Sequence, residues 1–454
     1  MVVVMITSEM EPWASTGGLG EILGTFPEAL ARRGMEVHCF LPRYQRVAAK
    51  DPAVRQGRVR VHFVEQPAYF DRPGLYGDER GDYPDNAERF TFFCRESLRR
   101  VEVENLKPDW IHAHDWPGAA SAVYLKRWRE QKPRWRSVRS MLTIHNLAYQ
   151  GLFPKECFET MALPAGSFEA DGFLFYGKGS LLRGGLACAD RLTTVSRAYA
   201  EEMLKPEGGA GMEELLRNRR DRFSGILNGI DTERWDPARD EALAARYDAA
   251  SLERRSENRA PLQRAFGLSA DPEPLLLGMV TRFDYQKGVD GVLEGLDRLM
   301  ALPVQLAVLG EGDRRTAEGL QAAAARFPGR IGVRVGFDRP LARRIYGGAD
   351  GLLIPSRYEP CGLTQMIAMR YGLVPVVRRT GGLKETVSEG PNGTGFCFEG
   401  LAAEDLLGAV TRAAVLRRGD PIGWRALQRR GMVVDFSIDQ MAADYAALYE
   451  REAA

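Results

Sequence analysis

The chain has 454 residues, too many for one ordinary hydrophobic core, so we expect two or three domains. Its formal net charge is +1, from 62 basic and 61 acidic residues, and this balance argues against nucleic acid or an anionic membrane as a partner. The six cysteines are scattered without a C-x-x-C pair, which argues against a disulfide framework or a zinc site and favours a reducing cytoplasm.

Two further observations favour a cytoplasmic protein. Residues 1–7 are apolar but short and lack a basic segment, so they predict a buried first strand rather than a signal peptide. No apolar run reaches the roughly 18 residues that a membrane-spanning helix needs.

Short apolar runs alternate with helix-like segments along the chain. In the first half, the runs predicted to be strands are 2–7, 36–41, 58–64, 90–93, 110–113, 141–144 and 192–195. In the second half, they are 275–280, 305–309, 332–336, 351–354 and 374–377. Strands that alternate with helices predict βαβ units, and continuous rather than alternating hydrophobicity predicts parallel strands buried on both faces.

A charged, alanine-rich stretch that ends in DPEP at 271–274 separates the two halves. We predict an N-terminal Rossmann-like domain over 1–240, a linker over 241–273 and a C-terminal Rossmann-like domain over 274–434. An amphipathic helix is predicted in the tail, 435–454, because apolar residues recur there at helical spacing. The fold class is therefore α/β, with two Rossmann-like domains that face a cleft.

A glycine-rich stretch, TGGLG at 16–20, follows the first predicted strand and opens a helix. Glycines let the backbone approach a phosphate or a sugar closely, and the helix start supplies N–H donors. The alternative is a tight strand-to-helix turn without a ligand.

Polar side chains also follow later strands of the first half. His112 and His114 with Asp115 suggest metal ligands, but no further histidine or cysteine cluster completes a set. Asp115 is better suited to bind sugar hydroxyls, or to cap a helix beside core histidines. His145 could bind a hydroxyl, act as an acid or base, or be a buried core residue. Asn228 is first a turn residue and second a ligand contact.

In the second half, Arg282 and Lys287 flank the end of a strand and suit a diphosphate, although a solvated surface pair is the alternative. Glu359 follows another strand, and residues 361–364 lead into a helix whose N–H groups suit an anion. A third strand is followed by the glycines of 380–382, where a sugar could lie against backbone donors.

In these motifs the chain resembles the bacterial glycogen synthase and plant starch synthase family. The matching stretches are TGGLG (16–20), LYG (75–77), DN (85–86), HAHDW (112–116), TIHNLAYQG (143–151), NGID (228–231), TRFDYQKG (281–288), PSRYEPCGLTQ (355–365), RRTGGL (378–383) and DFS (435–437). They occur in family order across nearly the whole chain.

The resemblance implies a GT-B fold with a glucan acceptor on the N-terminal side and a nucleotide sugar on the C-terminal side. It also implies that the C-terminal helix packs back on the first domain. The implied reaction transfers glucose from a nucleotide sugar to the non-reducing end of an α-1,4-glucan with retention of configuration. ADP-glucose is the favoured donor, and UDP-glucose is the alternative. No metal and no other cofactor is implied.

The resemblance also assigns residue roles. Arg282 and Lys287 would hold the leaving diphosphate, where negative charge develops. Glu359 would orient the donor glucose and stabilise positive charge during a front-face attack. The residues implied to be catalytic are Glu359, Arg282, Lys287, Asp115 and His145. The residues implied to bind substrate are Ser15, Gly17, Gly18, Asn146, Asn228, Phe337, Cys361, Gly362, Leu363, Thr364, Thr380, Gly381 and Gly382, with Phe337 stacking on the base.

The chain departs from the family pattern at the first glycine loop, where Ser15 replaces a lysine. The loss of a charge-assisted hydrogen bond would weaken donor binding by about 1.5–3 kcal/mol unless a neighbour such as Arg43 compensates. Two alternatives therefore stand beside a glucan synthase. One is a related retaining transferase that uses small maltooligosaccharides or other substrates, and the other is a weakly catalytic glucan-binding protein. Retention of the catalytic residues argues against the second.

Overall fold

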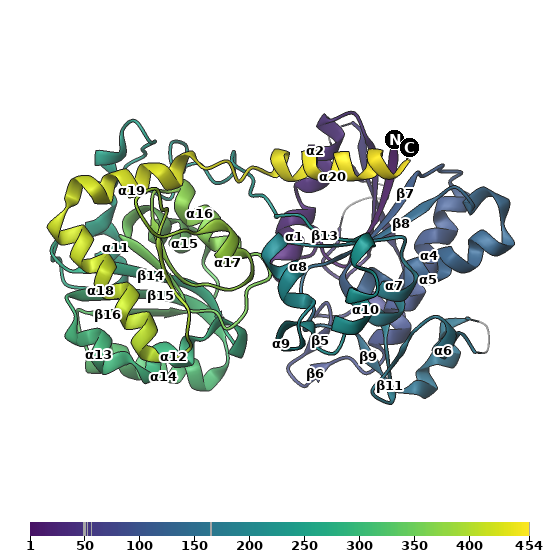
Figure 1. Cartoon of the computed structure of the whole chain (residues 1–454), viewed down its shortest axis with the longest axis horizontal. Coiled ribbons are helices and arrows are strands. Elements are labelled where there is room, and N and C mark those ends of the chain that lie inside the picture. The colour runs from purple at the N-terminus through teal and green to yellow at the C-terminus, as the bar shows by residue number, and fades with distance from the viewer. Residues whose placement is uncertain (49–50, 52, 56, 164–165, 454) are drawn as a thin grey trace. The chain divides into compact units, whose positions relative to one another are not determined.

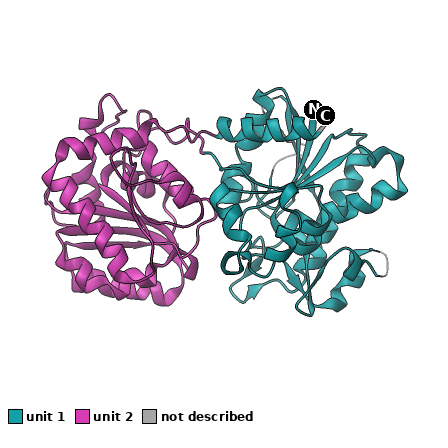
Figure 2. Ribbon diagram, in the orientation of Figure 1, with its two compact units in different colours: residues 1–229, 438–454 teal, residues 230–437 magenta. Residues whose placement is uncertain are grey.

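The computed structural model describes residues 1–48, 51, 53–55, 57–163 and 166–453. The chain forms two compact units, of which unit 1 contains residues 1–229 and 438–454 and unit 2 contains residues 230–437 (Figure 2). Each unit is built on a mainly parallel sheet, so the predicted α/β class with two Rossmann-like halves is confirmed.

Unit 1 has an eight-stranded sheet among its described residues. Its strands are β1 (Val2–Ile6), β2 (Glu36–Pro42), β3 (Ala53–Arg55), β4 (Val59–Val64), β7 (Trp110–His114), β8 (Arg139–Ile144), β12 (Arg191–Thr194) and β13 (Phe223–Gly225). The spatial order is β13-β12-β8-β7-β1-β2-β4-β3, and every neighbouring pair is parallel except β3 and β4.

The other elements of unit 1 surround this sheet (Figure 1). Its α-helices are α1 (Gly18–Leu23), α2 (Phe26–Arg32), α3 (Pro67–Phe70), α4 (Asn86–Val103), α5 (Asp115–Gln131), α6 (Ser167–Ala170), α7 (Leu181–Cys188), α8 (Arg197–Met203), α9 (Pro206–Gly209), α10 (Glu213–Arg217) and α20 (Ile438–Ala453). Shorter pieces are the 3₁₀ turns η1 (Pro133–Trp135), η2 (Lys155–Met161) and η3 (Arg220–Arg222) and the strands β5 (Gly77–Asp78), β6 (Gly81–Asp82), β9 (Leu152–Phe153), β10 (Leu174–Phe175) and β11 (Lys178–Ser180).

Unit 2 has a parallel sheet of six strands within the described chain. They are β14 (Leu275–Phe283), β15 (Val304–Gly312), β16 (Ile331–Val335), β17 (Gly351–Ile354), β18 (Val374–Arg378) and β19 (Phe396–Phe398). Their spatial order is β16-β15-β14-β17-β18-β19. The helical elements are η4 (Leu252–Asn258), α11 (Arg259–Phe266), η5 (Tyr285–Lys287), α12 (Val289–Glu294), α13 (Leu296–Ala301), α14 (Arg314–Arg326), α15 (Arg339–Gly348), α16 (Thr364–Arg370), α17 (Gly381–Thr386), α18 (Ala403–Gly419) and α19 (Pro421–Val433).

One predicted strand is wrong. Residues 90–93 lie inside helix α4, where Phe90, Cys94, Ser97 and Val101 are buried at a helical spacing of three to four residues. A short apolar run does not by itself distinguish a buried helical turn from a strand. The prediction also missed β13 and β19, which are only three residues long.

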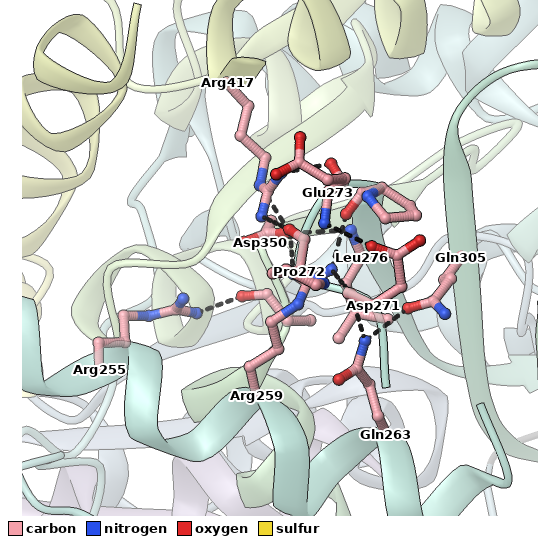
Figure 3. Close-up of polar contacts among 12 residues, drawn as sticks. Arg255, Arg259, Gln263, Asp271, Pro272, Glu273, Leu276, Gln305, Asp350 and Arg417 are labelled. Carbon is pink, nitrogen blue, oxygen red and sulfur yellow. Dashed lines mark hydrogen bonds and ion pairs between the residues drawn. The ribbon is translucent and has the colours of Figure 1, made fainter. Parts of the chain in front are cut away.

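The stretch 241–273, expected as a linker, contains η4 and α11 and belongs to unit 2. Figure 3 shows the polar contacts that fasten it at the amino ends of β14 and β17. Arg259 Nη1 lies 2.5 Å from Asp350 Oδ2, which also accepts a hydrogen bond from the Leu276 backbone N–H at 2.8 Å. Arg417 Nε approaches the same carboxylate oxygen at 2.9 Å. These contacts make the stretch an integral part of unit 2.

The C-terminal helix α20 packs against α2 in unit 1 (Figure 1). Its tyrosines 445 and 449 are fully buried. The Tyr449 hydroxyl lies 2.6 Å from Nδ1 of His112 on β7, and Nε2 of the same histidine lies 2.6 Å from the Thr143 hydroxyl on β8. The helix is therefore fixed to the sheet by buried hydrogen bonds as well as by apolar packing.

We expect the substitution Tyr449→Phe to destabilise the protein, because it leaves Nδ1 of the buried His112 without its partner. The free energy of unfolding, measured by urea titration, should fall by about 1–3 kcal/mol. Tyr445→Phe is the matched control, since its hydroxyl makes only 3.3 Å contacts with Thr143 and Thr193. A loss for Tyr449→Phe no larger than that for Tyr445→Phe would contradict the role assigned to this hydrogen bond.

Candidate active site

In unit 2, Arg282 and Lys287 lie at the carboxyl end of β14. The chain turns there through η5, which is capped at its start by the Asp284 carboxylate: this group accepts from the backbone N–H of Lys287, the third residue of η5, at 3.1 Å. Gly288 follows with φ of +67°, and a Cβ at this position would approach the Pro355 carbonyl oxygen to 2.3 Å. The guanidinium of Arg282 is half-exposed and lies 3.3 Å from Asp284.

Glu359 lies in the loop after β17 and is 6% exposed. Its Oε2 accepts hydrogen bonds from Nζ of Lys287 at 2.6 Å and from the Ser356 hydroxyl at 2.9 Å. The structure thus brings together a carboxylate and an ammonium that are 72 residues apart. Sequence reasoning missed the role of Ser356, whose only signal is a small hydroxyl directly after a strand.

The glycines after β18 pack against the backbone of this same loop. Gly382 N donates to the Glu359 carbonyl oxygen at 2.9 Å. A Cβ on Gly381, whose φ is +45°, would lie 2.0 Å from that oxygen, and a Cβ on Gly382 would lie 2.0 Å from the Cys361 oxygen. Only glycine permits this approach, so these glycines hold the loop that carries Glu359. The Gly382 N–H is therefore satisfied within the protein.

Residues 361–364 connect Glu359 to helix α16, which begins at Thr364. Gly362 has φ of +74°, and the Gln365 side chain fixes the turn by donating from Nε2 to the carbonyl oxygens of Cys361 at 3.0 Å and Gly362 at 2.8 Å. Leu363 and Thr364 complete the turn and are only partly buried.

Phe337 follows β16 and is 74% exposed, which is unusual for a phenylalanine. The guanidinium of Arg339 lies 5.6 Å from its ring centroid. An exposed aromatic face at the carboxyl edge of the sheet suits stacking of a planar base.

In unit 1, Asp115 is the first residue of α5, at the carboxyl end of β7. Its φ is +51°, a strained value for a residue other than glycine. The Asp115 Oδ1 accepts from the backbone N–H groups of His145 at 2.6 Å and Asn146 at 3.3 Å. Burial raises the pKa of this carboxyl to about 7, and the nearby Glu9 adds to the rise.

His145 follows β8 and shares a hydrogen bond with His114, whose Nδ1 lies 3.1 Å from the His145 Nε2. Burial lowers the pKa of both rings, so both are neutral at pH 7. Both nitrogens of His112 are engaged by the protein, as described above, which makes this residue part of the core. Within the described part of the chain, no cluster of three or more histidine, cysteine or acidic residues is arranged to hold a metal ion.

The first glycine loop, which contains Ser15, Gly17 and Gly18, is exposed. It is tied down by Glu9, which sequence reasoning missed and which is 4% exposed. The Glu9 carboxylate accepts from Thr16 N at 2.6 Å and from the Thr16 hydroxyl at 2.8 Å.

Two further residues of unit 1 were singled out from the sequence. Asn228 follows β13 and is 6% exposed, and its Oδ1 has no hydrogen-bond partner among the described residues. Arg43, suggested as a substitute for the missing lysine, instead forms an ion pair with Glu65.

The strand order explains why these side chains meet within each unit. In unit 2 the winding direction reverses between β14 and β17, and in unit 1 it reverses between β1 and β7. Loops diverge at such a switch point, and ligands of open α/β sheets bind there. The Lys287–Glu359 pair lies at the first switch point, and the loop after β1 and Asp115 lie at the second.

Comparison with known proteins places the chain in a family. The model of the starch synthase catalytic domain matches residues 2–218, and the model of glycosyl transferases group 1 matches residues 263–415. Glycogen synthase from Anaeromyxobacter dehalogenans (strain 2CP-C) is 44% identical over 471 residues, which cover 99% of each chain. The chain belongs to the glycogen synthase and starch synthase family. It is therefore a glycosyltransferase of the glycogen or starch synthase type.

Further relatives agree with this assignment. Glycogen synthase 2 from Geobacter sulfurreducens is 40% identical over 480 residues, covering 100% of this chain and 99% of its own. The catalytic domain of starch synthase IV from Arabidopsis thaliana, bound to ADP and acarbose, is 31% identical with a TM-score of 0.90 over 99% of both chains. The GT-B fold predicted for this chain is confirmed. No helix among the described residues has the length and apolar character required to cross a bilayer.

We expect Asp115→Asn to change the pH dependence of stability. The folded-state pKa of about 7 lies above the usual value of 3.8, so the folded protein binds a proton that the unfolded chain releases between these values. The contribution of Asp115 to wild-type stability should therefore fall as pH rises from about 4 to about 7. The variant has no carboxyl group to titrate, so it should not lose this stability. Its amide oxygen can still accept from the two backbone N–H groups. Urea unfolding should show the advantage of the variant growing to at most about 4 kcal/mol across this window.

Asp221→Asn is the matched control for the substitution itself, because Asp221 is an exposed aspartate of the same unit. Between pH 4 and pH 7 the stability advantage of Asp115→Asn should grow more than that of Asp221→Asn. An Asp115→Asn difference that stays flat or shrinks between pH 4 and pH 7 would show that Asp115 is ionised in the folded state throughout this range.

Proposed function

We propose that the protein transfers glucose from ADP-glucose to the non-reducing end of an α-1,4-glucan with retention of configuration. The observation that carries this proposal is the Lys287–Glu359 contact of 2.6 Å at the switch point of unit 2. UDP-glucose is the second donor candidate, because an exposed ring at Phe337 can stack on either base.

The donor diphosphate would be held by Arg282 and Lys287. In the structure these cations face Asp284 and Glu359, so a diphosphate would compete with carboxylates for them. Arginine can bind two phosphate oxygens in a fork, and lysine neutralises a third. The backbone of 361–364, which turns at Gly362 with a positive φ, would border the phosphate and the sugar.

The positive charge of Lys287 and the negative charge of Glu359 match the charges that develop when the bond between the sugar and the diphosphate breaks. As the bond between the sugar C1 and the phosphate oxygen lengthens, negative charge develops on the diphosphate and positive charge on the sugar ring. Lys287 stabilises the first and Glu359 the second. The acceptor hydroxyl oxygen forms the new bond to C1 on the same face, and its proton passes to the leaving phosphate oxygen. Atoms and charges balance without an enzymic nucleophile.

The unit 1 residues would bind sugar hydroxyls. Asp115, with a pKa of about 7, can donate or accept a hydrogen bond near neutral pH. His145 is neutral, and the buried Asn228 offers an oxygen without a partner among the described residues. Neutral hydrogen-bonding groups of this kind recognise hydroxyls rather than phosphates.

A second function is favoured by one observation at Ser15. Its hydroxyl donates to the Gly17 carbonyl oxygen at 3.3 Å and carries no charge toward a ligand. The alternative is therefore a related retaining transferase that extends small maltooligosaccharides or uses another nucleotide sugar.

The test is the release of ADP or UDP from each nucleotide sugar, with glycogen or short maltooligosaccharides as acceptors. We expect ADP release with ADP-glucose and glycogen. Glu359→Gln should lower kcat by about 100-fold or more while the circular dichroism spectrum stays unchanged, because charge stabilisation is lost but shape is kept. Glu318→Gln, on the exposed face of α14, is the control and should keep wild-type kcat.

Three results would redirect the proposal. Turnover of UDP-glucose alone would replace the donor, and turnover with short oligosaccharides but not glycogen would favour the second function. An unchanged kcat in Glu359→Gln would remove this carboxylate from the reaction.

We expect Ser15→Lys to strengthen donor binding, since it restores an ammonium beside the glycine loop. A charge-assisted hydrogen bond would lower KM for ADP-glucose by about tenfold or more. Ser15→Ala removes only the hydroxyl and should change KM by less. If Ser15→Lys leaves KM unchanged or raises it, the loop held by Glu9 works without the lysine.

A further inference from the structure

A second histidine stands behind His145 in unit 1. His114 is 1% exposed, on the last position of β7, and its Nδ1 lies 3.1 Å from Nε2 of His145. The ring of His112 packs on it with centroids 4.2 Å apart. His114 is therefore held by the core, and one of its nitrogens is aimed at a predicted catalytic side chain.

The protons on this pair can be counted. Both rings are neutral, so each carries one N–H, and one ring must donate to the other across the 3.1 Å contact. Either His114 Nδ1–H donates to His145 Nε2, or His145 Nε2–H donates to His114 Nδ1. The two arrangements place the remaining proton on different atoms.

The other nitrogen of His114 decides between them. Nε2 of His114 is buried and has no hydrogen-bond partner among the described residues. If His145 were the donor, this atom would be a buried N–H without an acceptor. If His114 is the donor, the atom is a bare lone pair, and unsatisfied buried acceptors are more common than unsatisfied buried N–H groups.

We propose that His114 is a positioning residue that donates from Nδ1 to His145 and thereby fixes the proton of His145 on its own Nδ1. The other ring nitrogen of the half-buried His145, Nδ1, forms no hydrogen bond within the described part of the chain. His145 then presents an N–H donor, which a sugar hydroxyl oxygen can accept. This assignment rests on the proposed function only for the identity of the acceptor.

The Asp115 carboxylate supports the same arrangement from the other side. It accepts from the His145 backbone N–H at 2.6 Å and so fixes the position of the residue whose ring His114 orients. Backbone and ring of His145 are held by consecutive residues at the end of β7, and a sheet element positions groups more accurately than a free loop does.

The tautomers can be read directly by NMR. The chain contains five histidines, so labelling with ring ¹⁵N histidine gives few signals, and long-range ¹H–¹⁵N spectra report which nitrogen of each ring carries the proton. We expect the Nδ1–H form for both His114 and His145 in the protein without substrate. An Nε2–H form of His145 would overturn the proposal, whatever the enzyme transfers.

Variants test the role of His114 in the reaction. His114→Leu removes the donor, so the Nε2–H form of His145 should appear and kcat/KM for ADP-glucose should fall about tenfold, the value of one neutral hydrogen bond. His114→Asn places an amide N–H near the position of Nδ1 and should restore the Nδ1–H form and most of the activity. His38→Leu removes a buried histidine outside this network and should change neither readout.

The outcomes separate the inference from the proposed function. If His114→Leu changes the tautomer but not the rate, His114 is not a positioning residue for this reaction. If His114→Leu does not fold, His114→Asn and the wild-type spectrum still decide the tautomer. If the enzyme releases no nucleotide from any donor, the proposed function and the role of His114 in catalysis are both wrong. The NMR spectrum would then still show whether His114 donates a hydrogen bond to His145.

Discussion

In a parallel sheet, all strands have their carboxyl ends on the same side. The proposed site residues of each unit lie on that side, at the point where the strand order reverses direction. In unit 2 the reversal separates the loops after β14 and β17, which carry Lys287 and Glu359. In unit 1 it separates the loop after β1 from Asp115 at the end of β7. At the opposite end of the unit 2 sheet, the Asp350 network joins the amino ends of β14 and β17 to the stretch 241–273 (Figure 3), and the Lys287–Glu359 pair lies at the carboxyl ends, where open α/β sheets bind ligands.

The local geometry at these points is costly, and the surrounding structure is built to hold it. Gly381 and Gly382 approach the backbone after β17 so closely that no other side chain fits, and one of them donates to the Glu359 carbonyl oxygen. Asp115 combines a positive φ with a raised pKa, two features that each lower stability. Strain and buried charge at strand ends are typical of a site that must be rigid before its ligand arrives.

The sequence was sufficient to predict the α/β class, most central strands and the strand-end position of the site residues, because buried parallel strands are continuous apolar runs. The strand predicted at 90–93 was wrong because a run of four residues, three of them phenylalanine, is too short to show whether its period is that of a helix or a strand. The contributions of Glu9 and His114 could not be predicted for a different reason. Glu9 acts through Thr16 and through a Tyr76 hydroxyl 67 positions away, and the proton count at His114 needs interatomic distances.

The two units differ in the charge of their site residues, and this difference bears on the serine at position 15. Unit 2 supplies Arg282 and Lys287, whereas the groups described in unit 1 are acidic or neutral: Glu9, Asp115 and His145. The loop that carries Ser15 is fastened by the Glu9 contacts with Thr16, which hold its backbone without supplying a positive charge. In the proposed reaction, the cations of unit 2 meet the phosphate charge, and the neutral donors and acceptors of unit 1 suit sugar hydroxyls. A lysine at position 15 would add a charge-assisted donor for phosphate to unit 1.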